Sequence, residues 1–314
     1  MPLTTIMSDD DIRALKWYYE VELRQGVFTR GSRFINMLPT RKLLERIRLF
    51  GLKVLDIGTM EGAFSVMASR AGANVVAYDR LMLGDRVATV KESYDADFDY
   101  RAGDPFHIFA EKFRSSGEAN FDCVLLSGVL YHTIEPSVFL YNARSLLRNG
   151  GILVFETACA ISNDAALYFN ERGRFFKFTN YYQPSTAWLD YFLRIIGFQI
   201  IDVEYVDPVQ PEFDGKRISR VAMTCVLSDD SILEADDEWA AQRLSLKELA
   251  EFAPIRKDAP VDLSSRLSPD RYAPGLYYRD TPKRTLRLTD VVTTKTKLVR
   301  DQAKCVLRLD DRLY

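Results

Sequence analysis

One stretch, KVLDIGTMEGAFSVMASRAGANVVAYDR at residues 53–80, constrains the fold more than any other part of the chain. A short apolar run ends in Asp-x-Gly, a second glycine follows, and a helical pattern leads to another apolar run that ends in Asp79. Glycine permits a tight turn and a close approach of the next helix, so the pattern predicts strand, helix, strand. The question is which ligand the loop between Asp56 and Gly62 binds.

The same alternation of strands and helices continues beyond this stretch. Continuous apolar runs such as CVLLS and ILVFE are typical of parallel strands that are covered on both faces. We therefore predict an α/β, doubly wound, Rossmann-like fold with a seven-stranded, mostly parallel sheet. The predicted strands are 53–57, 74–78, 98–101, 121–127, 151–157, 199–206 and 219–227, and the predicted helices of this part are 62–71, 136–147 and 186–197.

Composition divides the chain into three parts. Residues 1–50 are predicted to form an N-terminal helical cap, with helices over 9–23 and 38–51, and residues 51–227 the ligand-binding domain. Residues 228–314 are first acidic, then proline-rich, then mixed with a basic excess. We interpret them as a C-terminal extension that packs on the core or mediates self-association, for example as a homodimer.

Charge and cysteine usage narrow the classes of function. A net charge of -2 and a pI near 5.9 argue against a protein whose affinity rests on neutralising phosphates. No basic, apolar leader is visible, and no apolar run approaches the ~18 residues that would span a bilayer. The cysteines are scattered without metal-ligand spacing, so we expect reduced thiols, a cytoplasmic protein and no required metal. They are Cys123, Cys159, Cys225 and Cys305.

The loop itself points to a ligand that contains a nucleoside. Asp79, at the end of the second strand, is placed where a carboxylate accepts hydrogen bonds from two ribose hydroxyls. A dinucleotide and S-adenosylmethionine (SAM) are the two candidates. Met60 stands where a dinucleotide site has its middle glycine, and Asp56 suits a cationic ammonium group better than a pyrophosphate. The loop therefore favours SAM.

Several motifs resemble a known family. VLDIGTMEG, VVAYDR, AGDPF, FDCVLLSGVLYHTIEP and RNGGILVFET are similar, in order and spacing, to the motifs of class I SAM-dependent methyltransferases. Within that class, WYYEVELRQGVFTRG, SGVLYHTIEP and NYYQPSTAWLDYFLRIIGF resemble the group related to tRNA wobble-uridine (cmo5U/mo5U34) methyltransferases. The resemblance covers roughly residues 10–227 and implies SAM as cofactor and S-adenosylhomocysteine (SAH) as product.

The resemblance also implies roles for single residues. Gly58 and Gly62 would lie close to the methionyl part of SAM, and Asp56 would orient the loop and the ammonium group. Asp79 would bind the ribose. Two further positions complete this predicted cofactor site: Asp104 would reach the adenine amino group, and Ser127 would lie beside the sulfonium.

The chemistry is expected just after the strand 121–127. SGVLYHTIEP places Tyr131 and His132 there, and histidine titrates near neutral pH. We predict His132 as general base or acceptor-orienting group, with a purely structural histidine as the alternative, and Tyr131 as its catalytic-site partner that hydrogen-bonds the substrate or lines the pocket. Acceptor contacts are predicted from the aromatic and basic segments, at Trp17, Arg174 and Tyr182.

Three functions remain open at this stage. The first is O-methylation of a small-molecule or glycan hydroxyl. The second is modification of tRNA, for which Lys283, Arg284 and their basic neighbours up to Arg300 would have to form a basic face. The third is a non-catalytic protein of the same fold. The choice between O- and N-methylation is also open, because His132 suits either.

Overall fold

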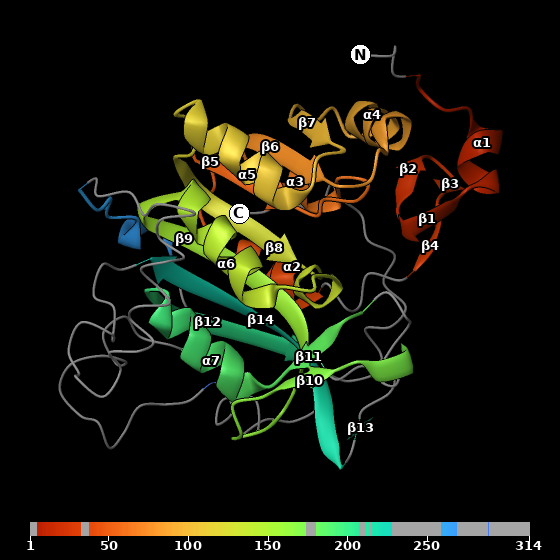
Figure 1. Cartoon of the computed structure of the whole chain (residues 1–314). Helices are drawn as coiled ribbons and strands as arrows, with labels where there is room; N and C mark the ends of the chain where they lie inside the picture. The colour runs from red at the N-terminus through yellow and green to blue at the C-terminus, as the bar shows by residue number, and fades with distance from the viewer. Residues whose placement is uncertain are drawn as a thin grey trace.

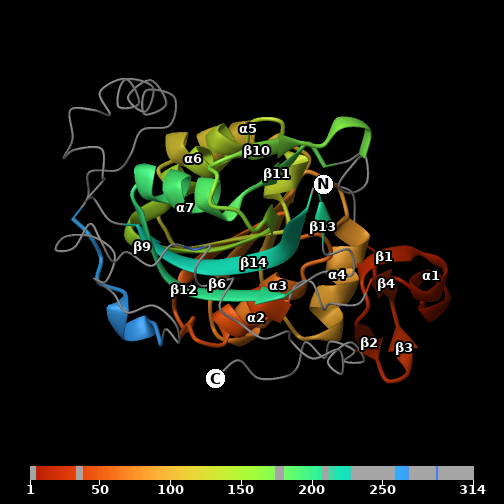
Figure 2. The ribbon, with the colours of Figure 1, turned by 90° about the horizontal axis from the view of Figure 1, so that it is seen from below.

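A computed structural model describes residues 5–32, 38–173, 180–206, 212–213, 215–227, 259–268 and 288. One sheet dominates the fold and lies between two layers of helices (Figures 1 and 2). In spatial order its strands are β12 (Phe198–Val206), β14 (Lys216–Leu227), β9 (Leu147–Ala160), β8 (Phe121–Ser127), β5 (Lys53–Ile57), β6 (Asn74–Asp79) and β7 (Asp99–Ala102), with β13 (Glu212–Phe213) paired to β14.

The pairing of these strands confirms the predicted sheet. Strands β7, β6, β5, β8 and β9 are mutually parallel, whereas β14 runs antiparallel to both β9 and β12. Every residue of β8 is buried, as expected for a central strand that is covered on both faces. The fold is therefore α/β and doubly wound, with a seven-stranded, mostly parallel sheet.

Helices cover the two faces of the sheet separately. One hydrophobic core forms beneath α5, α6 and α7, and a second beneath α2, α3 and α4 (Figure 2). Helices α4 and α5 were not among the helices predicted from the sequence. The bounds are α1 (Asp9–Ala14), α2 (Leu38–Leu44), α3 (Ala63–Arg70), α4 (Gly84–Ser93), α5 (Phe106–Ser115), α6 (Pro136–Leu146) and α7 (Thr186–Ile195), with short 3-10 turns η2 (Leu130–His132), η3 (Glu171–Gly173) and η6 (Ser264–Arg266).

The N-terminal segment departs from the prediction. The helix expected over residues 9–23 ends at Ala14, and strands follow it: β1 (Lys16–Tyr19), β2 (Glu22–Arg24), β3 (Val27–Phe28) and β4 (Arg30–Ser32). Trp17, Tyr19, Val21 and Leu23 are all buried, which is the two-residue period of a strand. The helix expected over 38–51 is likewise shorter, because α2 ends at Leu44.

Part of the C-terminal extension packs against the core. Within residues 259–268, the Val261 amide donates to the Asn149 carbonyl at 2.9 Å, and Leu267 forms a bridge with Ile47. The basic residues from Lys283 to Arg300 lie outside the described residues. The domain boundaries at 50 and 227 and a role in self-association stay predictions.

A last pair of strands, β10 (Leu167–Phe169) and β11 (Tyr182–Pro184), forms a small antiparallel ladder beside β9.

Candidate active site

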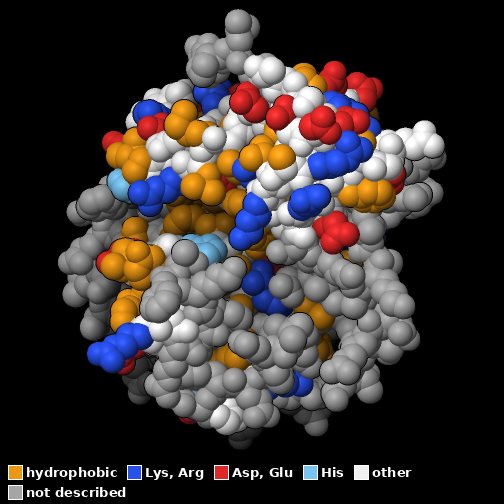
Figure 3. All heavy atoms as spheres, turned by 90° about the vertical axis from the view of Figure 1, so that its right-hand side faces the viewer, with side chains coloured by type: hydrophobic (Ala, Val, Ile, Leu, Met, Phe, Trp, Pro, Cys, Tyr) orange, Lys and Arg blue, Asp and Glu red, His pale blue; other side chains and the backbone are white. Residues whose placement is uncertain are grey.

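The parallel strands end on one side of the molecule, at the right in Figure 1. Figure 3 looks onto that side and shows a hollow with hydrophobic side chains in its floor, a histidine at its edge and Lys and Arg side chains along its rim. Ligands of open α/β sheets bind beyond the carboxyl ends of the strands, where the connections change faces. In this sheet that point lies between β5 and β8.

A buried carboxylate fixes the loop that follows β5. Asp56 is 2% exposed, and its Oδ2 accepts hydrogen bonds from Ser65 Oγ at 2.6 Å and Thr59 Oγ1 at 2.7 Å. Burial raises the pKa of Asp56 to about 6, although the bonds from Ser65 and Thr59 act in the opposite direction. Asp56 thus contacts the loop through Thr59 and the first turn of α3 through Ser65, and its role toward the ammonium group stays a prediction.

The two glycines of the loop are required by the backbone. Gly58 has φ +76°, and a Cβ there would lie 2.3 Å from Val129 Cγ2. Gly62 has φ +91°, and a Cβ there would lie 3.0 Å from the Phe98 ring. Both residues are in the left-handed region that side chains disfavour. Their absence of side chains lets the loop turn tightly at the end of β5.

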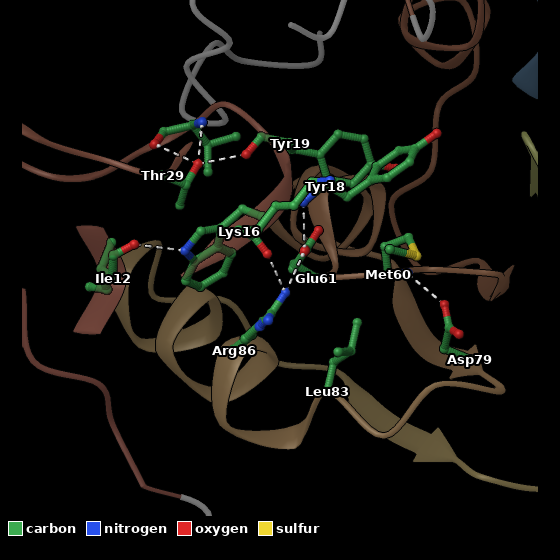
Figure 4. Close-up of polar contacts among 12 residues, drawn as sticks. Ile12, Lys16, Tyr18, Tyr19, Thr29, Met60, Glu61, Asp79, Leu83 and Arg86 are labelled. Atoms are coloured by element: carbon green, nitrogen blue, oxygen red, sulfur yellow. Dashed lines mark hydrogen bonds and ion pairs between the residues drawn. The ribbon is translucent and has the colours of Figure 1, made fainter. Parts of the chain in front are cut away.

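Asp79 holds the loop from the neighbouring strand. It ends β6 and is 5% exposed. Its Oδ2 accepts the Met60 amide (Figure 4) and its Oδ1 accepts the Leu81 amide, both at 2.8 Å. Burial raises its pKa, while the amides of Leu81 and Met60 lower it. A carboxylate oxygen has room for a second hydrogen bond, so two ribose hydroxyls remain compatible with this arrangement.

Asp104 and Ser127 lie on the same side of the sheet in different surroundings. Asp104 pairs with Lys112 at 2.7 Å, and both side chains are largely exposed. Ser127 ends β8 and is buried; its Oγ lies 2.8 Å from Thr40 Oγ1 and donates to Glu156 Oε2 at 3.3 Å. Their roles toward adenine and sulfonium stay predictions.

Glu61 is a buried acid of the glycine loop that was not among the predicted site residues. It lies inside the glycine loop and is 2% exposed, and its Oε1 accepts the Tyr18 amide at 2.8 Å (Figure 4). Arg86 Nη1 lies 3.4 Å from the same oxygen, while Oε2 is buried without a hydrogen-bond partner. Burial raises the pKa of Glu61, against the effect of the Tyr18 amide and Arg86. The sequence signal that could have identified it is an acidic residue between the two glycines of the loop.

Tyr131 and His132 form the turn η2 directly after β8. The Tyr131 ring is buried, its carbonyl accepts the Tyr181 amide at 2.7 Å, and the His132 ring packs edge-on against it at 4.5 Å between ring centroids. His132 itself is exposed. The structure thus brings the predicted pair to the edge where β8 ends, with one member anchored and the other accessible.

A buried ion pair stands behind Tyr131 and was not predicted. Arg220 on β14 donates to Glu156 on β9 through Nε at 2.6 Å and Nη2 at 2.7 Å, and to the Tyr131 hydroxyl through Nη1 at 2.9 Å. Both charged side chains are at most 9% exposed. Burial raises the pKa of Glu156 and Arg220 opposes that rise. The paired residues are 64 positions apart in the sequence, so no local motif marks them.

The residues predicted to contact the acceptor differ in burial and in whether the structure describes them. Trp17 is 3% exposed; its indole Nε1 donates to the Ile12 carbonyl at 2.9 Å, and Arg86 lies over its ring. These contacts give Trp17 a packing role and leave its predicted acceptor contact without support. Tyr182 is partly buried on β11 and packs edge-on against Phe169. Arg174 lies outside the described residues.

The described residues contain neither a metal-binding cluster nor a helix suited to cross a membrane. Within the ranges given above, no group of three or more His, Cys, Asp or Glu side chains is placed to hold a metal ion. No helix in the same described part is both long and apolar enough to cross a membrane.

The residues around the loop fit SAM. SAM carries a positive sulfonium, a positive ammonium and a ribose with two hydroxyls. Asp56, Glu61 and Asp79 are buried acids within or beside the loop, and the Glu61 Oε2 atom has no partner. Buried negative charge attracts a cationic ligand. The donor set therefore suits SAM better than a dinucleotide, whose pyrophosphate these acids would repel.

Comparisons with known proteins identify the family of the chain. A sequence model described as a methyltransferase domain matches residues 10–210. Ubiquinone biosynthesis O-methyltransferase of Maricaulis maris is 32% identical over 118 residues, which cover 37% of this chain and 44% of that protein. The enzyme of the same name from Roseobacter denitrificans is 37% identical over 108 residues, which cover 34% and 41%. The chain thus spans less than half the length of these curated relatives.

Solved structures also resemble the chain. The N-terminal domain of EvdMO1 with SAH bound shares 16% identity, with 71% of this chain and 98% of that chain covered and a TM-score of 0.49. The 1,6-didemethyltoxoflavin-N1-methyltransferase of Burkholderia thailandensis shares 21% identity, with 60% and 78% covered and a TM-score of 0.44. Because the domain match spans more than half of the chain, the protein belongs to the methyltransferase-domain family.

Proposed function

We propose that the protein methylates a hydroxyl oxygen of a small molecule or glycan. The observation that carries the proposal is the pair on η2: Tyr131 is anchored in the core, and His132 is exposed at the edge where β8 ends. The names of the curated relatives, which are O-methyltransferases, support transfer to oxygen. The free, buried thiols of Cys123, Cys159 and Cys225 suit a reducing compartment, so we place the reaction in the cytoplasm.

In this proposal, residues on one side of the hollow bind the cofactor and residues on the other side bind the acceptor. When bound, SAM supplies a methyl group that is activated by the positive sulfonium. Asp79 would bind the ribose hydroxyls, and Asp56 would hold the loop with its negative charge toward the cofactor. On the other side, His132 would orient the acceptor hydroxyl and accept the proton that it loses on methylation. Tyr131 keeps η2, and with it His132, in place.

The experiment uses purified protein, methyl-labelled SAM and an extract of the source cells that is separated into small-molecule, polysaccharide and RNA pools. We expect label in the small-molecule or polysaccharide pool and an at least tenfold loss with His132→Ala, because general acid–base catalysis contributes about 10²–10⁴-fold. The matched control is His107→Ala, which replaces the chain's other histidine, an exposed residue on α5. It should transfer label as the wild type does.

Other outcomes would contradict the proposal in different ways. Label in the RNA pool would support the wobble-uridine alternative, which the resemblance of SGVLYHTIEP motivates. If His132→Ala transfers label as fully as the wild type and binds SAH with unchanged affinity, the protein is still a methyltransferase but His132 has no catalytic role. SAH binding without label in any pool would favour the non-catalytic alternative.

A further inference from the structure

Strand β1 lies against the cofactor loop and is fastened there at two points. The Tyr18 amide donates to Glu61 Oε1 at 2.8 Å, and the Lys16 carbonyl accepts from Arg86 Nη1 at 2.9 Å (Figure 4). Arg86 in turn pairs with Glu61 at 3.4 Å. Glu61 belongs to the loop and Arg86 to α4, so the path of β1 is set by the same elements that form the cofactor site.

The alternation of the strand separates the aromatic residues of β1. Trp17 and Tyr19 are 3% and 5% exposed and belong to the core, whereas Tyr18, between them, is 38% exposed. Successive side chains of a strand point to opposite faces. The Tyr18 ring rests edge-on against Tyr19 at 4.8 Å between centroids. Tyr18 is therefore the exposed aromatic residue of β1, and its amide is bonded to the cofactor loop.

The surroundings of the Tyr18 hydroxyl belong to the acceptor side of the site. Burial and the nearby Tyr131 raise the pKa of Tyr18, and Arg220 and Glu156 act on it as well. A hydrogen bond from Tyr18 is also among the interactions that set the pKa of Tyr131, after the larger effects of burial, Arg220 and Glu156. Both phenols stay protonated at neutral pH and cannot serve as bases. Because the Tyr18 hydroxyl donates to Tyr131, its oxygen remains to accept a hydrogen bond, and the Tyr131 proton remains to be donated.

Hydrogen-bond directions and charge define what this cluster can bind. Arginine only donates, so the Tyr131 oxygen accepts from Arg220 and its own proton is directed to another acceptor. Glu156 compensates the charge of Arg220 through two hydrogen bonds. The cluster is thus neutral, with the Tyr131 hydroxyl as donor and the Tyr18 oxygen as acceptor, and is backed by an internal ion pair. An uncharged oxygen fits it, whereas a carboxylate or phosphate would find no net positive charge.

We propose that Tyr18 is an acceptor-binding residue, held beside the cofactor loop by Glu61, and that Tyr18 and Tyr131 together bind an uncharged hydroxyl of the acceptor. This inference rests on the proposed O-methyl transfer and names the chemistry of its substrate. It also replaces Trp17 with its neighbour as the acceptor contact on the N-terminal segment.

The first test is Tyr18→Phe, which removes one hydroxyl and keeps the ring. Transfer of label into the accepting pool, diluted below saturation, should fall about 2–10-fold, the effect of one neutral hydrogen bond of about 0.5–1.5 kcal/mol. The affinity for SAH, measured by calorimetry, should stay within about twofold. Tyr191→Phe is the matched control: Tyr191 is 37% exposed and lies on α7. Unchanged transfer by Tyr18→Phe, or a large loss of SAH affinity, would overturn the proposal.

A second measurement keeps the inference separate from the proposed reaction. Catechol, an uncharged pair of hydroxyls, and benzoate, a charged ring of similar size, are titrated into the SAH complex and followed by NMR. We expect catechol to bind more tightly than benzoate, and Tyr18→Phe to weaken catechol binding at least about twofold. Equal binding of the two probes, or the same catechol affinity in wild type and variant, would overturn the inference even if methyl transfer is confirmed. The expected result would support it even if no extract pool takes label.

Discussion

We call the end of the sheet after β5 and β6 the cofactor edge and the end after β8 and β9 the acceptor edge, after the ligands proposed for them. The two edges are held by different kinds of contact. At the cofactor edge, after β5 and β6, the contacts are local: Asp56 bonds residues three and nine positions away, and Asp79 bonds the amides of Leu81 and Met60. At the acceptor edge, after β8 and β9, they are long-range: Arg220 bonds Glu156 and Tyr131 across separations of 64 and 89 residues.

The cofactor edge therefore depends on local hydrogen bonds that shape a loop, whereas the acceptor edge depends on a buried pair of opposite charges. The cofactor loop gets its shape from backbone amides and small hydroxyls within one strand–helix unit. The acceptor edge depends on an ion pair that forms only when β14 is placed beside β9. We therefore expect changes at the acceptor edge to affect the stability of the whole fold, and changes at the cofactor edge to act mainly on ligand affinity and on pH dependence.

The largest expected effect is the loss of stability in Glu156→Ala. Removing one partner leaves Arg220 buried with an uncompensated charge, which typically costs about 3–5 kcal/mol. The measurement is the free energy of unfolding from denaturant titration. The control is Asp99→Ala, which breaks the Arg101–Asp99 pair; that pair has the same short distance of 2.7 Å, but both side chains are about half exposed. It should cost about 0–1 kcal/mol. Similar losses in the two variants would show that the acceptor edge does not depend on its buried pair.

The local character of the cofactor edge explains how much the sequence predicts. VLDIGTMEG and VVAYDR carry Asp56, both glycines and Asp79 within one strand–helix–strand unit, and the alternation of apolar runs and helical patterns predicts the seven strands and their mostly parallel arrangement. Tyr131 and His132 are predicted because they follow a strand directly. Arg220 looks like any charged residue at the edge of an apolar run, and only the pairing of β14 with β9 gives it a partner.

The N-terminal segment shows where periodicity misleads. Ile12, Leu15, Tyr18 and Tyr19 have helical spacing, and three acids precede them as at a helix start. The acids do begin a helix, with Ser8 as its cap, but the helix is only six residues long. Beyond it the alternating burial of Trp17 and Tyr19 sets the strand period. Strand β1 pairs with β4, and Glu61 accepts the Tyr18 amide; no local sequence pattern indicates either contact.

A pH dependence of stability tests the buried acid of the cofactor loop. The pKa of Asp56 is raised from 3.8 to about 6, so in this window the folded state binds a proton that the unfolded state has lost. The stabilisation is present below pH 3.8 and is lost as pH rises through about 6. Two pKa units correspond to about 3 kcal/mol. Relative to Asp56→Asn, which cannot titrate, the wild type should lose stability by up to that amount between about pH 4 and 7. A constant difference in unfolding free energy across this range would contradict the raised pKa.

The smallest expected effect concerns affinity alone and sharpens the comparison within the cofactor edge. Asp79→Asn removes the charge that would bind the ribose, and hydrogen bonds to charged groups contribute about 1.5–3 kcal/mol, so SAH should bind about 10–100-fold more weakly by calorimetry. Asp104→Asn should weaken it less than about threefold, because this carboxylate is 43% exposed and already paired with Lys112. If Asp104→Asn weakens SAH as much as Asp79→Asn does, exposure is no guide to cofactor contact at this edge, and the adenine role predicted for Asp104 gains support. If neither variant changes the affinity, the loop shape set by Asp56 and the glycines would have to hold the cofactor through the backbone.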